Sequence, residues 1–225
     1  MTDISNFDSA AKNSQALPAV RTSIYATFGK RVFDLFIVLI SAPILVPVIA
    51  VLWFVVRRDG GSGFFSHKRV GKDGREFPCH KIRTMVVDAE AQLETYLAAH
   101  PEEREVWNRE FKLKNDPRIT PIGRVLRATS LDELPQFFNV LRGEMSFVGP
   151  RPVPRKELAM YGTQVGYYEA VRPGVTGLWQ VSGRNDISYD ERIELDRLYA
   201  QTHSFKNDVV ILARTFKAVL GKTGY

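Results

Sequence analysis

An adjacent pair of carboxylates, Asp132 and Glu133, lies in the stretch 130–152, which reads SLDELPQFFNVLRGEMSFVGPRP. Paired carboxylates can hold a divalent cation, and an aspartate can attack phosphorus to form an acyl phosphate. Apolar residues at helical spacing, from Leu134 to Leu141, predict a helix directly after the pair. The pair is therefore a candidate for phosphoryl-transfer chemistry at the start of a helix.

Helix capping is the alternative use of the same pair. Acidic residues are favoured in the first turn of a helix, and Ser130 with Glu133 has the spacing of a capping box. Pro135 counts against that register, because it fits the third helical position only if Asp132 is the N-cap. Glu133 would then have no capping duty, so both uses stay open here.

Three arginines on rigid or tightly turned backbone favour the chemical use. Arg151 lies between two prolines, Arg172 precedes a Pro-Gly turn, and Arg184 lies in a glycine turn. A fixed guanidinium binds phosphate in a bidentate manner, and glycine turns let backbone amides approach the same oxygens. These arginines predict a diphosphate substrate. The alternative is that each one pairs with a nearby carboxylate and braces its loop.

A diphosphate next to two carboxylates requires a cation between them. Without one, the negative groups would repel each other. Mg²⁺ commonly takes one or two carboxylates together with substrate phosphates. The sequence therefore predicts a Mg²⁺ site at Asp132 and Glu133.

The segment 32–56 is apolar except for Asp34 and is long enough to cross a bilayer as a helix. Pro43 and Pro47 fall in its middle, and basic residues flank both of its ends, which places both ends on the cytoplasmic side. We expect a re-entrant helix that breaks at Ser41-Ala42-Pro43, with Ser41 or neighbouring protein satisfying the freed backbone groups. A single span kinked by proline is the alternative.

The remaining elements must position the carboxylates and arginines. The stretch GFFSHKRVGKDGREFPCHKIRTM predicts a β-hairpin that turns at Asp73-Gly74. Residues 86–113 read as two helices separated by Pro101, and Ser188 with Glu191 predicts a capped helix. A last helix carries an apolar stripe and lies either on a membrane surface or on the core. The stripe consists of Val209, Leu212, Phe216, Val219 and Leu220.

Length and composition limit the class of protein. A chain of 225 residues suits one ordinary domain, and its net charge of +6 suits nucleic acid, anionic lipid or a phosphorylated substrate. The single cysteine, Cys79, excludes an intramolecular disulfide and indicates a reducing compartment. Residues 1–27 are polar and are expected to form a disordered tail.

Taken together, these blocks resemble the monotopic bacterial phosphoglycosyl transferases that begin surface-polysaccharide assembly on undecaprenyl phosphate. The resemblance runs from Phe28 to Tyr225 and rests on four blocks. They are KRVFDLFIVLISAPILVPV, the hairpin sequence, SLDELPQFFNVLRGEMSFVGPRPV and VRPGVTGLWQVSGRND. NDPRIT, GLWQVSGRND and the short length are most similar to the exopolysaccharide-initiating galactose-1-phosphate transferases.

The resemblance implies a role for each matching residue. Asp132 is the expected nucleophile, Glu133 its partner near Mg²⁺, and Arg151 the phosphate-binding arginine. The family breaks its membrane helix at a Ser-Pro pair, whereas Ala42 precedes Pro43 here and the serine is Ser41. Further substrate-binding positions are implied at Lys81, Arg83, Arg172, Thr176, Gln180 and Arg184.

The implied reaction moves a hexose-1-phosphate, galactose-1-phosphate or its glucose competitor, from a UDP-sugar to undecaprenyl phosphate and releases UMP. The implied fold is mainly α with a short β-hairpin, attached to the cytoplasmic face of the bacterial inner membrane. The expected divisions are a tail (1–27), a re-entrant membrane helix (28–58) and a compact cytoplasmic catalytic domain with interfacial helices (59–225). Membrane lipids, and a second copy of the chain in a homodimer, are the expected further partners.

Two other functions compete with catalysis. A non-catalytic membrane scaffold for polysaccharide assembly would use the same fold. A membrane-tethered nucleic-acid-binding protein would use the basic charge, but the acidic pair would repel a phosphodiester backbone and no recognition motif accompanies the arginines. We therefore expect no nucleic-acid partner.

Overall fold

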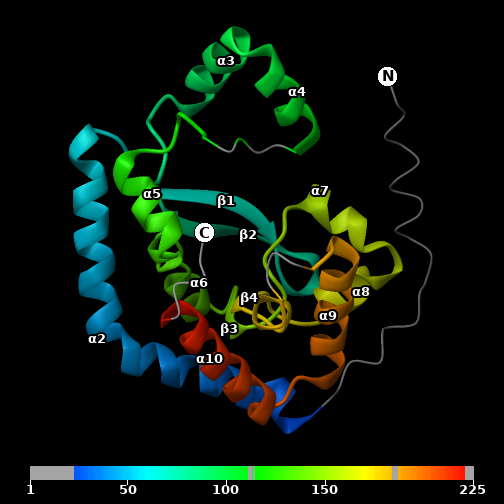
Figure 1. Cartoon of the computed structure of the whole chain (residues 1–225). Helices are drawn as coiled ribbons and strands as arrows, with labels where there is room; N and C mark the ends of the chain where they lie inside the picture. Colours follow the sequence, from blue (N-terminus) through cyan, green and yellow to red (C-terminus); the bar gives the residue numbers. More distant parts are fainter. Residues whose placement is uncertain (1–22, 111–112, 114, 184–186, 221–225) are drawn as a thin grey trace.

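The computed structural model describes residues 23–110, 113, 115–183 and 187–220. These residues form a mainly helical protein with two small sheets, as Figure 1 shows. The expected mainly α fold with a short hairpin is confirmed, and a parallel pair of strands is added to it. The helices are α2 (Lys30–Val56), α3 (Ala89–Ala99), α4 (Pro101–Glu110), α5 (Pro121–Ala128), α6 (Gln136–Arg142), α7 (Arg155–Leu158), α8 (Val165–Glu169), α9 (Tyr189–Thr202) and α10 (Phe205–Leu220).

The apolar segment forms α2, which follows a short π-helical turn, Tyr25–Gly29. Helical structure thus begins slightly before residue 28, where the sequence placed the start of this segment. Among the described residues, Tyr25–Asp59 is the one helical stretch long and apolar enough to cross a membrane. Only 11% of its most apolar window is buried in the protein, which distinguishes it from the core helix of a soluble domain.

The expected break at Pro43 is instead a bend within a continuous helix. The helix continues past Pro43 and Pro47, although neither residue can donate a backbone hydrogen bond, and Figure 1 shows the two halves of α2 running in different directions. The Ser41 hydroxyl donates to the carbonyl of Ile37 at 2.7 Å. A proline at 43 frees the carbonyl of Leu39, so Ser41 does not serve the freed group. Such bonding to the preceding turn bends helices by itself.

The buried face of α2 packs on the rest of the protein. Val38 and Ile49 join the main apolar core, which also contains Ile82, Phe137 and Met145. Burying an aliphatic or aromatic side chain contributes about 1.5–3 kcal/mol, so this face fixes the helix against the domain. The opposite face of α2 is left exposed.

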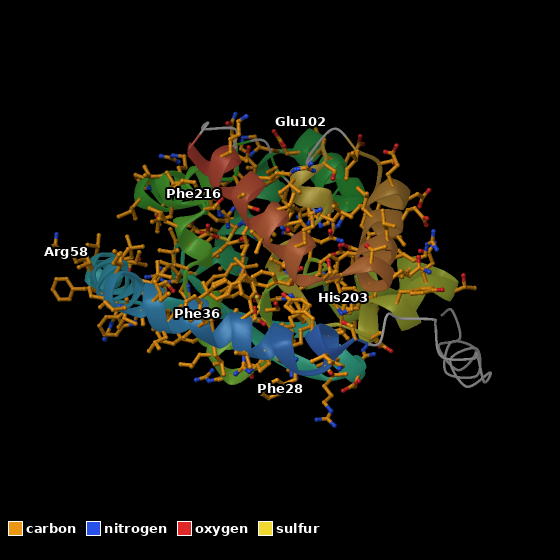
Figure 2. All side chains as sticks on the ribbon, turned by 90° about the horizontal axis from the view of Figure 1, so that it is seen from below. Phe28, Phe36, Arg58, Glu102, His203 and Phe216 are labelled. Carbon is orange, nitrogen blue, oxygen red and sulfur yellow. The ribbon has the colours of Figure 1, made fainter. Side chains whose placement is uncertain are left out.

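Figure 2 shows this exposed side of the molecule. The first half of α2 runs beside α10 there, and their contact is made partly by Phe33 and Phe205, with ring centroids 5.2 Å apart. Phe28, Phe36 and Phe216 are labelled in this view and are each more than half exposed. Exposed apolar side chains gathered on one side of a protein mark an interaction surface, and a lipid surface suits this composition.

The predicted hairpin is present. Its strands are β1 (Phe64–Val70) and β2 (Glu76–Ile82), joined by a 3₁₀ turn, Lys72–Gly74. Asp73 and Gly74 both have positive φ, +59° and +70°, as a tight hairpin turn requires. The Asp-Gly signal in the sequence therefore located the turn correctly.

A second sheet lies deeper in the protein. It pairs β3 (Ser146–Val148) in parallel with β4 (Gly174–Thr176). The segment that follows β3 lies close against β4, with the amide of Gly149 donating to Thr176 and that of Gly174 to Pro150. A Cβ on Gly149 would come within 2.3 Å of a backbone oxygen, so only glycine fits. The parallel carboxyl ends point both loops in one direction.

The apolar stripe predicted for the last helix is divided between the two alternatives, because Leu212 packs on the core while Val209 and Phe216 lie on the exposed side. In α10 the inward positions are Asp208 and Ile211, whereas Val209 and Phe216 are 42% and 68% exposed. The reason is an ion pair: Asp208 accepts a hydrogen bond from Lys30 of α2 at 2.6 Å, and this bond sets the rotation of the helix. One face of α10 packs on the core and the other carries exposed apolar side chains.

Candidate active site

A cleft of about 1590 Å³ opens between the β1–β2 hairpin, the turn before α6, the loops after β3 and β4, and α10. Seven of the sequence-predicted residues line it: Lys81, Arg83, Asp132, Glu133, Arg151, Thr176 and Gln180. Enclosed clefts of this kind are where small-molecule sites usually form. The structure thus brings together side chains that lie up to about a hundred positions apart in the sequence.

One face of the hairpin lines the cleft. His67 lies directly opposite Cys79, and Phe65 opposite Lys81, so these four side chains share a face with Arg69. The other face carries Ser66 and His80, which are linked by a hydrogen bond of 2.8 Å. Period-two alternation therefore directs Arg69 and Lys81 into the same space.

The carboxylate pair lies in a 3₁₀ turn, Leu131–Glu133, and caps no helix. Ser130 has a positive φ of +57° and makes no capping hydrogen bond, and α6 begins only at Gln136. Neither capping register is formed, because Pro135 and the left-handed Ser130 shift the helix start beyond the pair. The carboxylates are left available for another role.

Lys81 of β2 links both carboxylates. Its Nζ is 2.7 Å from Glu133 Oε1 and 3.7 Å from Asp132 Oδ2. Burial raises the pKa of Asp132 above its usual value, and Lys81 opposes that rise. Burial also acts to raise the pKa of Glu133, but Lys81 and Arg151 outweigh it and hold that pKa below its usual value. The pKa values of the two neighbouring carboxyl groups are thus shifted in opposite directions, as is common for acid and base partners in active sites.

Arg69 and Arg151 face this pair without an acidic partner. Among the described residues, no hydrogen bond or ion pair joins either guanidinium to a carboxylate. Both line a small cavity of about 20 Å³ together with Lys81, Glu133 and Gln180. Burial lowers the pKa of Arg69, and the nearby Arg151 lowers it further. Two close, unpaired guanidinium groups are a suitable site for a phosphate.

The other predicted basic residues have different surroundings. Arg83 lines the cleft but is held by Asp59 at 2.8 Å and by the carbonyl of Met85, so it braces the end of α2. Arg172 is not among the cleft-lining residues, because its Nε donates to the carbonyl of Gly143 at 2.7 Å. Arg172 is thus held by a backbone carbonyl, in place of the carboxylate that the bracing alternative expected. Arg184 lies outside the described residues.

The predicted polar residues of the last blocks lie at the cleft wall. Thr176 shares a hydrogen bond of 2.7 Å with Thr215 of α10, and Gln180 lines both the cleft and the small cavity. Sequence reasoning missed Arg69 and Trp179, which also line the cleft. Alternation along β1 would have selected Arg69, because its side chain lies on the same face of the hairpin as those of Lys81 and Cys79.

The residues present fit a Mg²⁺ ion that is shared with a substrate. The described residues contain no group of three or more His, Cys, Asp or Glu side chains that could bind a metal by themselves. Mg²⁺ does not need such a cage, because water and substrate phosphates can complete its octahedron. Asp132 and Glu133 would supply the carboxylate oxygens for that kind of site.

Comparison with known proteins identifies relatives along almost the whole chain. The UDP-galactose-lipid carrier transferase of Erwinia amylovora is 52% identical over 197 residues, and the undecaprenyl-phosphate galactose phosphotransferase of Salmonella typhimurium is 50% identical over 197. Each alignment covers 88% of this chain but only 41% of the relative. The exopolysaccharide production protein ExoY of Rhizobium meliloti is 45% identical over 85% of both chains.

The chain therefore spans about two fifths of the length of the first two relatives and most of the third. The family described as bacterial sugar transferase matches residues 25–222, from the turn before α2 to just past the end of α10. That match includes the apolar helix, the hairpin, the carboxylate pair and both arginine-bearing loops. The chain belongs to the bacterial sugar transferase family.

Proposed function

We propose that the protein transfers a hexose-1-phosphate from a UDP-sugar to undecaprenyl phosphate and releases UMP, as the first membrane step of exopolysaccharide synthesis. The observation that carries the proposal is that a buried Asp132 lines the same cleft as two guanidinium groups, Arg69 and Arg151, neither of which forms an ion pair within the described part of the chain. A nucleophile beside an unfilled phosphate site suits phosphoryl transfer. The names of the first two relatives favour galactose as the sugar, with glucose as its competitor.

In the first step, an oxygen of Asp132 attacks the sugar-side phosphorus of the donor. A bond forms between that oxygen and phosphorus, the bond from phosphorus to the bridging oxygen breaks, and UMP leaves with the electron pair. Arg69 and Arg151 stabilise the charge that develops on the phosphoryl oxygens. Lys81 favours the ionised form of Asp132 and so opposes the effect of its burial, which raises the pKa.

In the second step, a phosphate oxygen of undecaprenyl phosphate attacks the same phosphorus. The bond to Asp132 breaks, the carboxylate is restored, and the product is a lipid-linked diphosphate sugar. A phosphate monoester has its second pKa at about 6, so the acceptor is mostly dianionic at neutral pH and needs little help from a base. Glu133 is then better suited to metal binding and positioning than to proton removal.

The apolar helix supports a position at a membrane for this chemistry. A long prenyl chain stays in the bilayer while its phosphate must meet a soluble nucleotide sugar, and the exposed side of α2 and α10 suits a position at that boundary. We propose that the protein sits on the cytoplasmic face of the inner membrane, with α2 entering and returning at its bend. Leu45, just beyond the bend, also lines the cleft.

Mg²⁺ bound by Asp132, Glu133 and the donor phosphates would neutralise charge on the diphosphate. Removing it with a chelator should therefore lower the rate of UMP release by at least about 10²-fold, and added Mg²⁺ should restore it. The assay is UMP release from purified protein before and after dialysis against EDTA. A chelator-insensitive rate would remove the metal from the mechanism.

Replacing Lys81 with methionine should shift the acidic limb of the pH–rate profile to higher pH. Lys81 lowers the pKa of Asp132 in the folded protein, so its loss raises that pKa and delays ionisation of the nucleophile. The measurement is kcat/KM for the UDP-sugar between pH 4 and 8, in steps of about half a unit, for both proteins. A limb that stays in place or moves to lower pH would contradict this role of Lys81.

The test of the function itself is UMP release with undecaprenyl phosphate and Mg²⁺, with UDP-galactose, UDP-glucose and UDP-N-acetylated sugars supplied separately. Release with one donor identifies the reaction and the sugar together. Silence with every donor, in folded and membrane-bound protein, would reject the proposed function and favour the scaffold.

A further inference from the structure

Two loops that carry cleft residues begin at the carboxyl ends of the parallel strands. The loop after β3 carries Arg151 and leads into α7, and the loop after β4 carries Trp179 and Gln180. Ligands bind at the carboxyl ends of parallel strands because the loops there converge. Neither loop has long secondary structure of its own, so side chains from other elements must hold them in place.

Arg192, in the first turn of α9, contacts the loop after β4 and α7, the helix that directly follows the Arg151 loop. Its guanidinium carbon lies 4.5 Å from the centroid of the Trp179 ring, which is the distance of a cation–π contact. The same guanidinium pairs with Glu157 of α7 at 3.3 Å. Only 14% of the Arg192 side chain is exposed, so the contact is held within the protein.

The neighbours of Arg192 fix its orientation. Tyr189, one turn earlier on α9, donates to Glu157 Oε1 at 3.1 Å, and its ring lies 5.3 Å from the Arg192 guanidinium. The Ser188–Glu191 capping box fixes the start of the helix itself. Arg192 is therefore a rigid bridge between two elements. One is α7, which follows the Arg151 loop, and the other is the ring of Trp179, which begins the turn that contains Gln180.

We propose that Arg192 is a positioning residue that sets the distance between the Arg151 loop and the Trp179–Gln180 loop, and so the width of the phosphate-binding end of the cleft. The consequence for turnover rests on the proposed function. Arg192 itself is absent from the residues that line the cleft, so it acts through Trp179 and Glu157. Misplacing binding groups by about 1 Å can cost about 10²-fold in rate.

The chain offers a matched control on the same helix. Arg197 also pairs with a carboxylate, Glu194, and also lies over an aromatic ring, that of Tyr167 at 6.0 Å. Neither Glu194 nor Tyr167 lines the cleft. Replacing Arg197 thus removes a similar set of contacts from α9 without touching either loop.

The test compares Arg192→Met, Arg192→Lys and Arg197→Met in the full chain in detergent. In Arg192→Met, hydrogen–deuterium exchange should rise in both loops, 149–154 and 177–182, and kcat/KM for the UDP-sugar should fall about 10- to 100-fold. Arg192→Lys keeps the charge and should recover part of that loss. Arg197→Met should change neither the loops nor kcat/KM by more than about twofold.

Unchanged exchange in both loops of Arg192→Met, or a kcat/KM within about twofold of wild type, would overturn the inference. Equal loosening of the loops by Arg197→Met would also overturn it, because the effect would then belong to α9 as a whole. If Arg192→Met fails to fold, Glu157→Gln removes only the carboxylate end of the bridge, and looser exchange in 149–154 is again expected. Wild-type protein that is inactive with every donor would reject the proposed function, while the exchange data would still decide the role of Arg192.

Discussion

Replacing Asp132 with asparagine should abolish UMP release, by at least about 10³-fold, while the protein remains folded and membrane-bound. An amide oxygen is a poor nucleophile towards phosphorus, so the phosphosugar intermediate cannot form. Stability should hold or improve. Burial raises the pKa of Asp132, which means that the ionised carboxylate costs folding free energy at neutral pH, and asparagine carries no charge. The measurements are UMP release and thermal unfolding.

Asp73→Asn is the matched control for that variant. Asp73 also lies in a 3₁₀ turn, and asparagine tolerates its positive φ of +59°. It lies in the turn of the hairpin and does not line the cleft, so its activity should stay at the wild-type level. Incubation with a donor labelled at the sugar-side phosphate should label wild-type protein and Asp73→Asn, but not Asp132→Asn. Label retained on Asp132→Asn would place the nucleophile elsewhere.

Local sequence signals predicted the elements that depend on neighbouring residues. The Asp73-Gly74 pair located the hairpin turn, and the Ser188–Glu191 capping box is formed at the start of α9. Both features depend on the backbone preferences of four or five consecutive residues, and these preferences can be read directly from the residue types. The apolar composition of 32–56 likewise predicted helical structure over this segment, where α2 forms.

Features that depend on distant contacts were not predictable in the same way. The sequence left open which face of α10 packs on the core, because the buried position of Asp208 depends on Lys30, 178 residues away in the sequence. The pairing of β3 with β4 involves strands of three residues each, too short to show a pattern. The sequence predicted a break at Pro43, but α2 continues past both prolines, because the rest of its backbone hydrogen bonds hold the helix together.

The arginines show the same limit at the candidate site. Sequence placed Arg151 and Arg172 equally, each beside proline on a turn, yet Arg172 donates to a carbonyl outside the cleft and Arg151 faces the carboxylate pair. The two arginines differ in whether a hydrogen-bond acceptor of the protein lies nearby. A guanidinium group is available to bind substrate only where no such acceptor already binds it. Arg69 was not predicted from the sequence. An arginine within a strand and without a flanking glycine or proline resembles an ordinary solvated cation in the sequence.

Replacing Lys30 with methionine should destabilise the protein by about 3–5 kcal/mol, because it leaves Asp208 charged and buried without a cation. Asp208 has no solvent exposure, and Lys30 Nζ lies 2.6 Å from its Oδ2. Tyr25 and Tyr199 also donate to this carboxylate, at 2.6 and 2.9 Å, but neutral hydroxyls do not compensate its charge. A loss of that size lowers the unfolding temperature by about 6–20 °C for a domain of this length.

The double variant Lys30→Met/Asp208→Asn separates a lost ion pair from lost packing. Removing both charges should recover more than half of the stability lost in Lys30→Met, since an uncharged amide can still accept hydrogen bonds from Tyr25 and Tyr199. Thermal unfolding in one detergent measures all three proteins. If the single variant unfolds within about 2 °C of wild type, the ion pair does not hold α2 to α10. If the double variant is no more stable than the single one, the loss comes from the lysine side chain's packing, and the rotation of α10 must be set by Ile211 and its apolar neighbours instead.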